Sequence, residues 1–122
     1  MKLSTEDIIC CPPPLFHCFG LVLGLLSCIT HGAAFVLPAP TFDAHATLDS
    51  LTKHECTGLH GVPTMFISVL QEHKKRGSPQ LHIRTGIAAG ASVPRVVVEQ
   101  LQAAFGFADI VNVYGIALSR CF

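Results

Sequence analysis

The sequence predicts an α/β fold in which a layered, mostly parallel sheet is flanked by helices. Segments of helical length alternate along the chain with short apolar runs, in the repeated order helix then strand. This alternation is typical of parallel strands that are joined by helical crossovers. The short runs are continuously apolar, which is expected of strands whose two faces are both covered.

The first predicted helix covers residues 15–30, which are uncharged and mostly apolar, and Gly32 stands where a left-handed C-terminal cap is expected. The apolar run 33–37 predicts a buried strand, because it is short and Pro38 closes it. Taken without a break, residues 15–37 also have the length of a membrane span, which stays open as an alternative. The histidines, hydroxyl side chains and glycine break in this stretch favour the helix and strand.

The middle of the chain continues the alternation with one helix and one strand. Thr41 or Asp43 would cap a helix that extends to about His54, because their side chains can accept hydrogen bonds from its first turn. Residues 57–60 form a weaker strand candidate, which ends at Gly61.

The second half of the chain supplies two further pairs of a helix and a strand. Pro63 suits the first turn of a helix that ends at the basic cluster 74–76, where cations interact favourably with the helix dipole. Residues 83–88 have the pattern of the next buried strand. Pro94 then opens the fourth helix, and the apolar run 110–113 is the final strand.

Length and composition limit the class of protein. The chain has 122 residues, which is one domain or part of one. Half of its residues are hydrophobic and only 13% are charged, which excludes intrinsic disorder and indicates that more protein covers part of the surface. The formal net charge of zero argues against a nucleic-acid partner. The six cysteines show no disulfide framework, so we expect reduced thiols and an intracellular location.

Three short loops rich in small residues follow the predicted strands, at residues 61–64, 89–92 and 114–116. In open α/β sheets, ligands bind beyond the carboxyl ends of the strands. Small residues let a ligand approach the backbone closely, and Tyr114 offers a stacking face and a hydroxyl. The spacing is compatible with a shared ligand site, and ordinary strand-to-helix turns are the alternative.

Motifs for several other kinds of site are missing. No glycine is followed by lysine and no G-x-G-x-x-G occurs, so the usual phosphate-binding loops are absent. Residues 90–94 begin like a nucleophile elbow but lack its final glycine. His54, Cys56 and His60 lack the spacing of the common zinc motifs. We therefore predict no metal ligand and no catalytic residue in this chain.

Four segments together resemble the adenylate-forming enzymes. Residues 11–20 read CPPPLFHCFG, residues 61–66 read GVPTMF, residues 89–94 read AGASVP, and residues 112–115 read NVYG. Their order and separations are similar to the motifs of that family. The resemblance extends over about residues 7–115, and the branch that looks most similar is the medium-chain fatty acyl-CoA synthetases.

The resemblance implies part of the N-terminal domain of an enzyme that uses ATP and magnesium to activate a fatty acid or other carboxylic acid. Coenzyme A then displaces AMP from the acyl-adenylate to form a thioester. By resemblance, the acyl substrate would lie beside His17 and Gly115. The adenine nucleotide would be bound by Ala89, Gly90, Ala91 and Tyr114.

Departures from the family pattern concern the phosphate and magnesium groups. The threonine and glutamate that follow tyrosine–glycine in the family are Ala117 and Leu118 here, and neither side chain can bind a hard cation. The phosphate loop and the small C-terminal domain with its lysine are also missing. We therefore expect residues 1–115 to be a partial AMP-binding domain and residues 116–122 a divergent tail.

The sequence thus predicts a fragment of an ATP-dependent fatty acid–CoA ligase that is inactive alone. Two alternatives stay open: a nucleotide- or acyl-binding α/β module without catalysis, and an unstable truncated remnant whose exposed apolar strands aggregate. Integral membrane insertion is not expected. The expected location is intracellular, with cytosol, peroxisome and mitochondrion all open.

Overall fold

A computed structural model describes residues 1–113 of the chain. Its centre is a five-stranded sheet with the strand order β2-β1-β3-β4-β5, in which every neighbouring pair is parallel. The strands are β1 (Ile8–Cys10), β2 (Ala34–Val36), β3 (Gly58–Leu59), β4 (Thr85–Ala89) and β5 (Asp109–Val113). The helices are η1 (Phe19–Leu26), α1 (Ser27–His31), α2 (Ala44–Lys53), α3 (Pro63–Lys75) and α4 (Arg95–Phe105).

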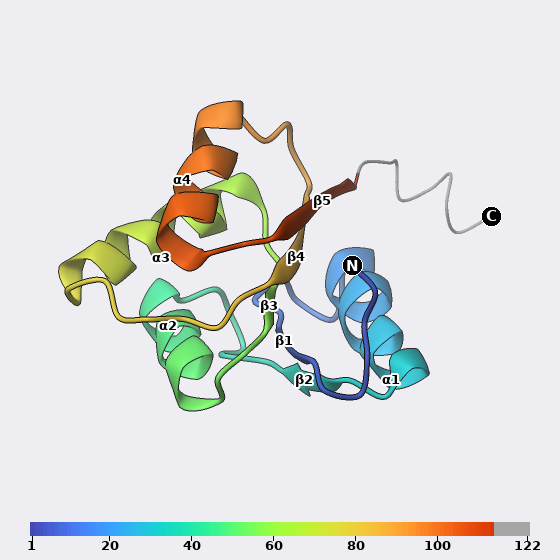
Figure 1. Cartoon of the computed structure of the whole chain (residues 1–122). Coiled ribbons are helices and arrows are strands. Elements are labelled where there is room, and N and C mark those ends of the chain that lie inside the picture. Colours follow the sequence, from blue (N-terminus) through green and yellow to red (C-terminus); the bar gives the residue numbers. More distant parts are fainter. Residues whose placement is uncertain (114–122) are drawn as a thin grey trace.

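The helices cover the two faces of the sheet unequally. Figure 1 shows α2, α3 and α4 on one face and the continuous η1–α1 segment on the other. The predicted α/β architecture with a parallel sheet between helical layers is therefore confirmed.

Strand β1 was not among the predicted strands, although it lies inside the sheet. Its residue Ile9 pairs with Phe35 of β2 on one side and with Gly58 of β3 on the other. The strand is only three residues long and the prolines of residues 12–14 follow almost at once. A run this short carries no periodicity, so its identity depends on the two neighbours that the fold supplies.

The first helix begins later than predicted, and the prediction that it starts at residue 15 is wrong. Residues 15–17 form a turn and a bend, and η1 begins at Phe19 as a π-helix that continues into α1. Gly32 ends α1 with a left-handed φ of +71°, as expected. No helix among residues 1–113 combines the length and hydropathy needed to cross a membrane.

Local signals placed the remaining helices well. The carboxylate of Asp43 accepts hydrogen bonds from the backbone N–H groups of His45 and Ala46, at 2.9 and 3.3 Å, so Asp43 and not Thr41 caps α2. Pro63 occupies the first turn of α3. Gly106 ends α4 with a φ of +74°. The strands β3 and β4 differ from their predicted ranges by one or two residues at their ends.

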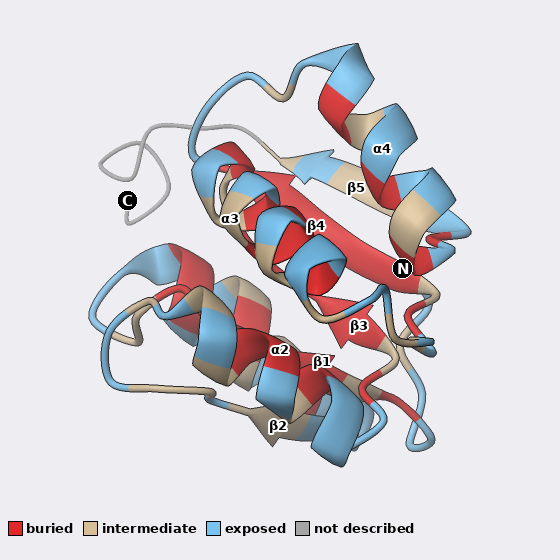
Figure 2. Ribbon diagram, turned by 90° about the vertical axis from the view of Figure 1, so that its left-hand side faces the viewer, coloured by how far each residue is buried: buried red, intermediate tan, exposed pale blue. Residues whose placement is uncertain are grey.

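Side chains of the strands point alternately into two apolar layers, one on each face of the sheet. The larger core lies between the sheet and α2–α4, and Figure 2 shows the buried residues of these elements facing one another. It includes Cys10, Leu48, Leu51, Leu59, Phe66, Ala88, Leu101 and Phe105. A smaller cluster on the η1 face joins Phe19, Ile87 and Ala89. Both faces of the central strands are thus covered, as the apolar strand pattern indicated.

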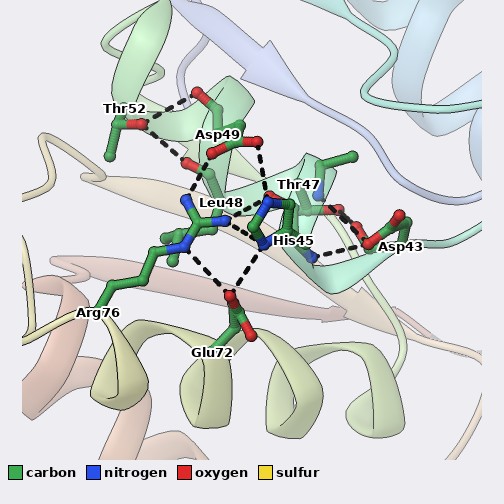
Figure 3. Close-up of polar contacts among 9 residues, drawn as sticks. Asp43, His45, Thr47, Leu48, Asp49, Thr52, Glu72 and Arg76 are labelled. Carbon is green, nitrogen blue, oxygen red and sulfur yellow. Dashed lines mark hydrogen bonds and ion pairs between the residues drawn. The ribbon is translucent and has the colours of Figure 1, made fainter.

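A group of polar side chains links α2 to α3 at the surface (Figure 3). Arg76 donates to the carboxylate of Asp49 at 2.5 Å and to that of Glu72 at 3.1 Å. The Nδ1 atom of His45 lies 3.0 Å from Glu72 and also contacts the Arg76 guanidinium. These ion pairs lie at the surface, where solvent screens them, so they stabilise the fold only weakly. They fix the relative position of the two helices.

Candidate functional site

The neighbouring strands β1 and β3 lead into connections on opposite faces of the sheet. The chain leaves β1 through η1 and α1 toward the edge strand β2, whereas it leaves β3 through α3 toward β4. Ligands of open α/β sheets bind outside the carboxyl ends of the strands at such a switch point. We therefore define the carboxyl edge as residues 11–20, 60–64 and 89–94, and treat it as the candidate site.

His17 lies in the segment that follows β1. Its side chain is exposed, and its Nδ1 atom accepts a hydrogen bond from the backbone N–H of Phe19 at 3.1 Å. Because Nδ1 is the acceptor, the neutral imidazole carries its proton on Nε2. Nε2 has no hydrogen-bond partner among residues 1–113, so it is available to donate to a ligand oxygen at the switch point.

The segment after β3 joins β4 by backbone hydrogen bonds. The N–H of Gly61 donates to the carbonyl of Ile87 at 3.0 Å, and the N–H of Ala89 donates to the carbonyl of Gly61 at 3.2 Å. The small-residue loop at 61–64 is thereby held directly beside the end of β4. The loops after β3 and β4 therefore lie at one edge of the sheet.

The end of β4 and the loop after it hold three of the predicted site residues. Ala89 is the last residue of β4 and is 7% exposed, so the prediction that it belongs to the loop is wrong. Gly90 and Ala91 are exposed. Gly90 has a left-handed φ of +87°, and a Cβ atom there would lie 2.8 Å from Cγ1 of Val62. Glycine therefore permits both the turn and the close approach of the two loops.

Phe19 connects the His17 segment to these loops. Its ring is 4% exposed and packs in one apolar cluster with Ile87 and Ala89, against which Val62 also lies. The structure thus brings the His17 segment and the loops after β3 and β4 to one edge. Tyr114, Gly115 and the tail 116–122 lie outside the described residues.

His60 is a buried polar residue at this edge, and it was not among the predicted site residues. Its side chain is 0% exposed, and its Nε2 atom lies 3.2 Å from the carbonyl oxygen of Leu23 in η1. Burial lowers the pKa of His60 to about 4, although the nearby backbone groups of Leu23 and Leu59 oppose this shift. Its Nδ1 atom has no partner among the described residues. The only sequence signal was a histidine at the end of an apolar run.

The other chemical candidates lie elsewhere or stay apart. His54 is exposed at the end of α2, whereas His60 is buried beneath η1, and residues 1–113 contain no group of three side chains placed to bind a metal ion. A hollow of about 440 Å³ lies between the C-terminal ends of α3 and α4. His73 and Phe105 line this hollow, which lies at the opposite edge of the sheet from the loops described above.

Sequence comparisons relate the chain to acyl-CoA ligases. Residues 1–117 match the AMP-binding enzyme family. The chain is 49% identical over 124 residues to an acyl-CoA ligase (SID4) of Ajellomyces capsulatus, a match that covers 100% of this chain and 21% of the relative. It is 35% identical over 107 residues to the mitochondrial medium-chain acyl-CoA ligase ACSF2 of Danio rerio, covering 88% of this chain and 18% of the relative.

Solved structures show the same architecture. A benzoate CoA ligase of Burkholderia xenovorans superimposes with a TM-score of 0.81 and 29% identity, over 93% of this chain and 23% of that chain. The O-succinylbenzoate coenzyme A synthetase of Bacillus subtilis, solved with ATP and magnesium, gives a TM-score of 0.77 with 28% identity. That match covers 95% of this chain and 23% of the synthetase. The chain thus spans about a fifth of the length of its relatives.

Proposed function

Since this chain belongs to the AMP-binding enzyme family, we propose that it forms the acid- and adenine-binding edge of an ATP-dependent acyl-CoA ligase. The observation that carries the proposal is the convergence of the His17 segment with the loops after β3 and β4, at the topological switch point. The substrate class that we propose is a fatty acid, because a medium-chain acyl-CoA ligase is among the relatives.

The exposed imidazole of His17 suits a carboxylic acid substrate. Its Nε2–H can donate to a carboxylate oxygen, because Nδ1 is engaged by the Phe19 N–H. Such a bond orients the carboxylate for its reaction with the α-phosphorus of ATP. We propose that Gly115 borders the acyl group nearby.

The loop after β4 suits a flat aromatic base. Gly90 and Ala91 are exposed and lack bulky side chains, so an adenine ring can lie directly on their backbone. Ala89 supports this loop from within β4. We propose that Tyr114 stacks on the adenine ring.

The described residues do not fit magnesium or the phosphates of ATP. The carboxyl edge as defined above contains no aspartate or glutamate, and magnesium requires oxygen ligands. Stabilisation of developing charge is often the largest contribution to catalysis. We therefore propose that the 122 residues bind acid and adenine without forming a thioester. The same absence of carboxylates favours the second candidate, a binding module without catalysis.

The proposal is tested with the purified 122-residue chain. Isothermal titration with AMP and with octanoate measures binding, and incubation with ATP, magnesium, octanoate and coenzyme A measures thioester formation. We expect saturable, weak binding of both ligands and no octanoyl-CoA. Failure of both ligands to bind would contradict the proposed site, and formation of octanoyl-CoA would contradict the inactivity of the chain alone.

A further inference from the structure

His60 joins the sheet to η1 across the switch point. Its backbone is fixed in the sheet, because its N–H donates to the Cys10 carbonyl at 3.0 Å. Its side chain reaches the opposite element, where Nε2 lies 3.2 Å from the Leu23 carbonyl. Among residues 1–113, no other hydrogen bond connects η1 to an element outside residues 11–36.

The acceptor of this hydrogen bond lies within the π-helical turns. The Leu23 carbonyl also accepts a hydrogen bond from the hydroxyl of Ser27 at 2.6 Å. A π-helix is rare in proteins, and each buried carbonyl group in it requires a hydrogen-bond partner like any other. The imidazole of His60 and the hydroxyl of Ser27 provide two such partners at one carbonyl.

A buried histidine at this position is costly. The Nδ1 atom of His60 has no partner among the described residues, and a buried polar atom without a hydrogen bond destabilises a fold. A phenylalanine of similar shape would avoid this cost and would still pack against the Phe19 ring, whose centroid is 6.1 Å away. Histidine, unlike phenylalanine, can also donate a hydrogen bond to the Leu23 carbonyl.

The same helix holds His17 in place. The N–H of Phe19 donates to the imidazole of His17, and the N–H of Leu21 donates to the His17 carbonyl at 3.1 Å. A Cβ atom on Gly20 would lie only 2.2 Å from the Pro14 carbonyl oxygen, so η1 begins directly against the turn that carries His17. Movement of η1 relative to β3 would therefore move His17.

We propose that His60 is a positioning residue, which anchors η1 to β3 through the Leu23 carbonyl and thereby fixes the orientation of His17 at the carboxyl edge. The contact itself is independent of any ligand. Only its purpose, the presentation of the His17 Nε2–H to a carboxylate, rests on the proposed function.

The test compares three variants of the 122-residue chain by NMR. His60→Phe retains a ring and removes the donor, whereas His60→Gln retains a donor close to the position of Nε2. His73→Phe is the matched control, because His73 is also buried, has an unpartnered Nδ1 among the described residues and donates from Nε2 to a backbone carbonyl, that of Pro79 at 2.8 Å. His73 lies on the other face of the sheet, away from η1.

Two measurements are made on each variant: amide hydrogen exchange along η1 and the ring-nitrogen shifts of His17, which report its tautomer. We expect His60→Phe to accelerate exchange in η1 about tenfold and to release His17 from the Nε2–H tautomer, with β4 unchanged. We expect His60→Gln to keep the η1 exchange rates and the His17 tautomer of the native chain, and His73→Phe to leave both readouts unchanged. Unchanged η1 exchange and His17 shifts in His60→Phe, or equal acceleration in η1 and β4, would overturn the proposal.

A second pair of variants decides the question if His60→Phe does not fold. His60→Asn shortens the side chain so that its amide donor cannot reach Leu23, and it is compared with His60→Gln. Retention of the His17 tautomer with Gln and its loss with Asn support the proposal, whereas identical behaviour overturns it. Ligand titration is scored separately, so failure of the acid or AMP to bind would refute the proposed function without affecting this result.

Discussion

Asp7 and Arg84 form a bidentate ion pair at the amino ends of the parallel strands, 77 residues apart in the sequence. The guanidinium donates from Nε to one carboxylate oxygen at 2.9 Å and from Nη2 to the other at 2.5 Å. Asp7 also accepts hydrogen bonds from the Thr57 hydroxyl and the Ser4 N–H, at 2.8 and 2.9 Å. One nearly buried carboxylate thus fixes the starts of β1, β3 and β4 relative to one another.

Removal of this charge is expected to destabilise the fold. Asp7→Asn leaves the guanidinium of Arg84 without its anionic partner, and we expect the free energy of unfolding to fall by about 2 kcal/mol. Urea denaturation followed by circular dichroism measures the change. Glu99→Gln is the control, because its ion pair with Arg95 is exposed and should contribute less than about 0.5 kcal/mol. Equal effects of the two substitutions would contradict the assigned role of Asp7.

The same carboxylate makes stability depend on pH in strong acid. Burial raises the pKa of Asp7, but the hydrogen bonds from Arg84, Thr57 and Ser4 outweigh burial and lower the pKa from 3.8 to about 2. A lowered pKa stabilises the folded state above pH 3.8, and about 2 kcal/mol is lost as the pH falls through 2. Denaturation at pH 4 and pH 2 should show this loss in the native chain and not in Asp7→Asn.

His60 is expected to cause a separate loss of stability at higher pH. Burial lowers its pKa from 6.5 to about 4, so the unfolded chain binds a proton over this range more readily than the folded chain. Stability is therefore greatest above pH 6.5 and should fall by about 3 kcal/mol as the pH drops to 4. His60→Gln removes this titration. If the native chain and His60→Gln showed the same dependence of stability on pH over this range, the lowered pKa assigned to His60 would be refuted.

The alternation of helices and strands could be predicted because local sequence signals determine where the helices begin and end. The Asp43 cap, the proline that opens α3 and the glycine that ends α4 each act on the backbone within one turn. The loops after β3 and β4 could also be placed at one edge, since consecutive parallel strands end on the same side of the sheet.

Other features depend on partners that are distant in the sequence. Strand β1 is defined by pairing with β2 and β3, and its three residues carry no periodic pattern of their own. Gly20 and Gly24 of η1 pack closely against the segment that follows β1. The anchor at His60 depends on a carbonyl 37 residues earlier. None of these distances can be derived from one sequence by local reasoning.

The close contact at Gly20 gives a further expectation. Gly20→Ala places a methyl group 2.2 Å from the Pro14 carbonyl oxygen, which is backbone and cannot rotate away. We expect a loss of about 1–3 kcal/mol, concentrated in η1, as measured by urea denaturation and hydrogen exchange. Gly61→Ala is the control, because its nearest neighbours would lie at an ordinary 3.5 Å. An undisturbed η1 in Gly20→Ala would contradict the packing described.

Ligand selectivity tests the division of the carboxyl edge. We expect His17→Ala to weaken octanoate binding by about tenfold to a hundredfold and to leave AMP binding unchanged, since a hydrogen bond to a charged group contributes about 1.5–3 kcal/mol. Titration calorimetry measures both affinities. His31→Ala, at an exposed histidine that ends α1, is expected to change neither. Parallel loss of octanoate and AMP in His17→Ala would show that His17 does not act on the acid alone.

The most direct test of the central claim is a chimeric ligase. Residues 1–113 of this chain replace the matching segment of the Ajellomyces capsulatus acyl-CoA ligase, to which the chain is 49% identical. Acyl-CoA formation is then measured with ATP, magnesium and coenzyme A, using the acid that the parent enzyme accepts. We expect the chimera to retain activity and to lose it with His17→Ala. A folded chimera that forms no acyl-CoA would contradict the claim that this chain is a working segment of such a ligase.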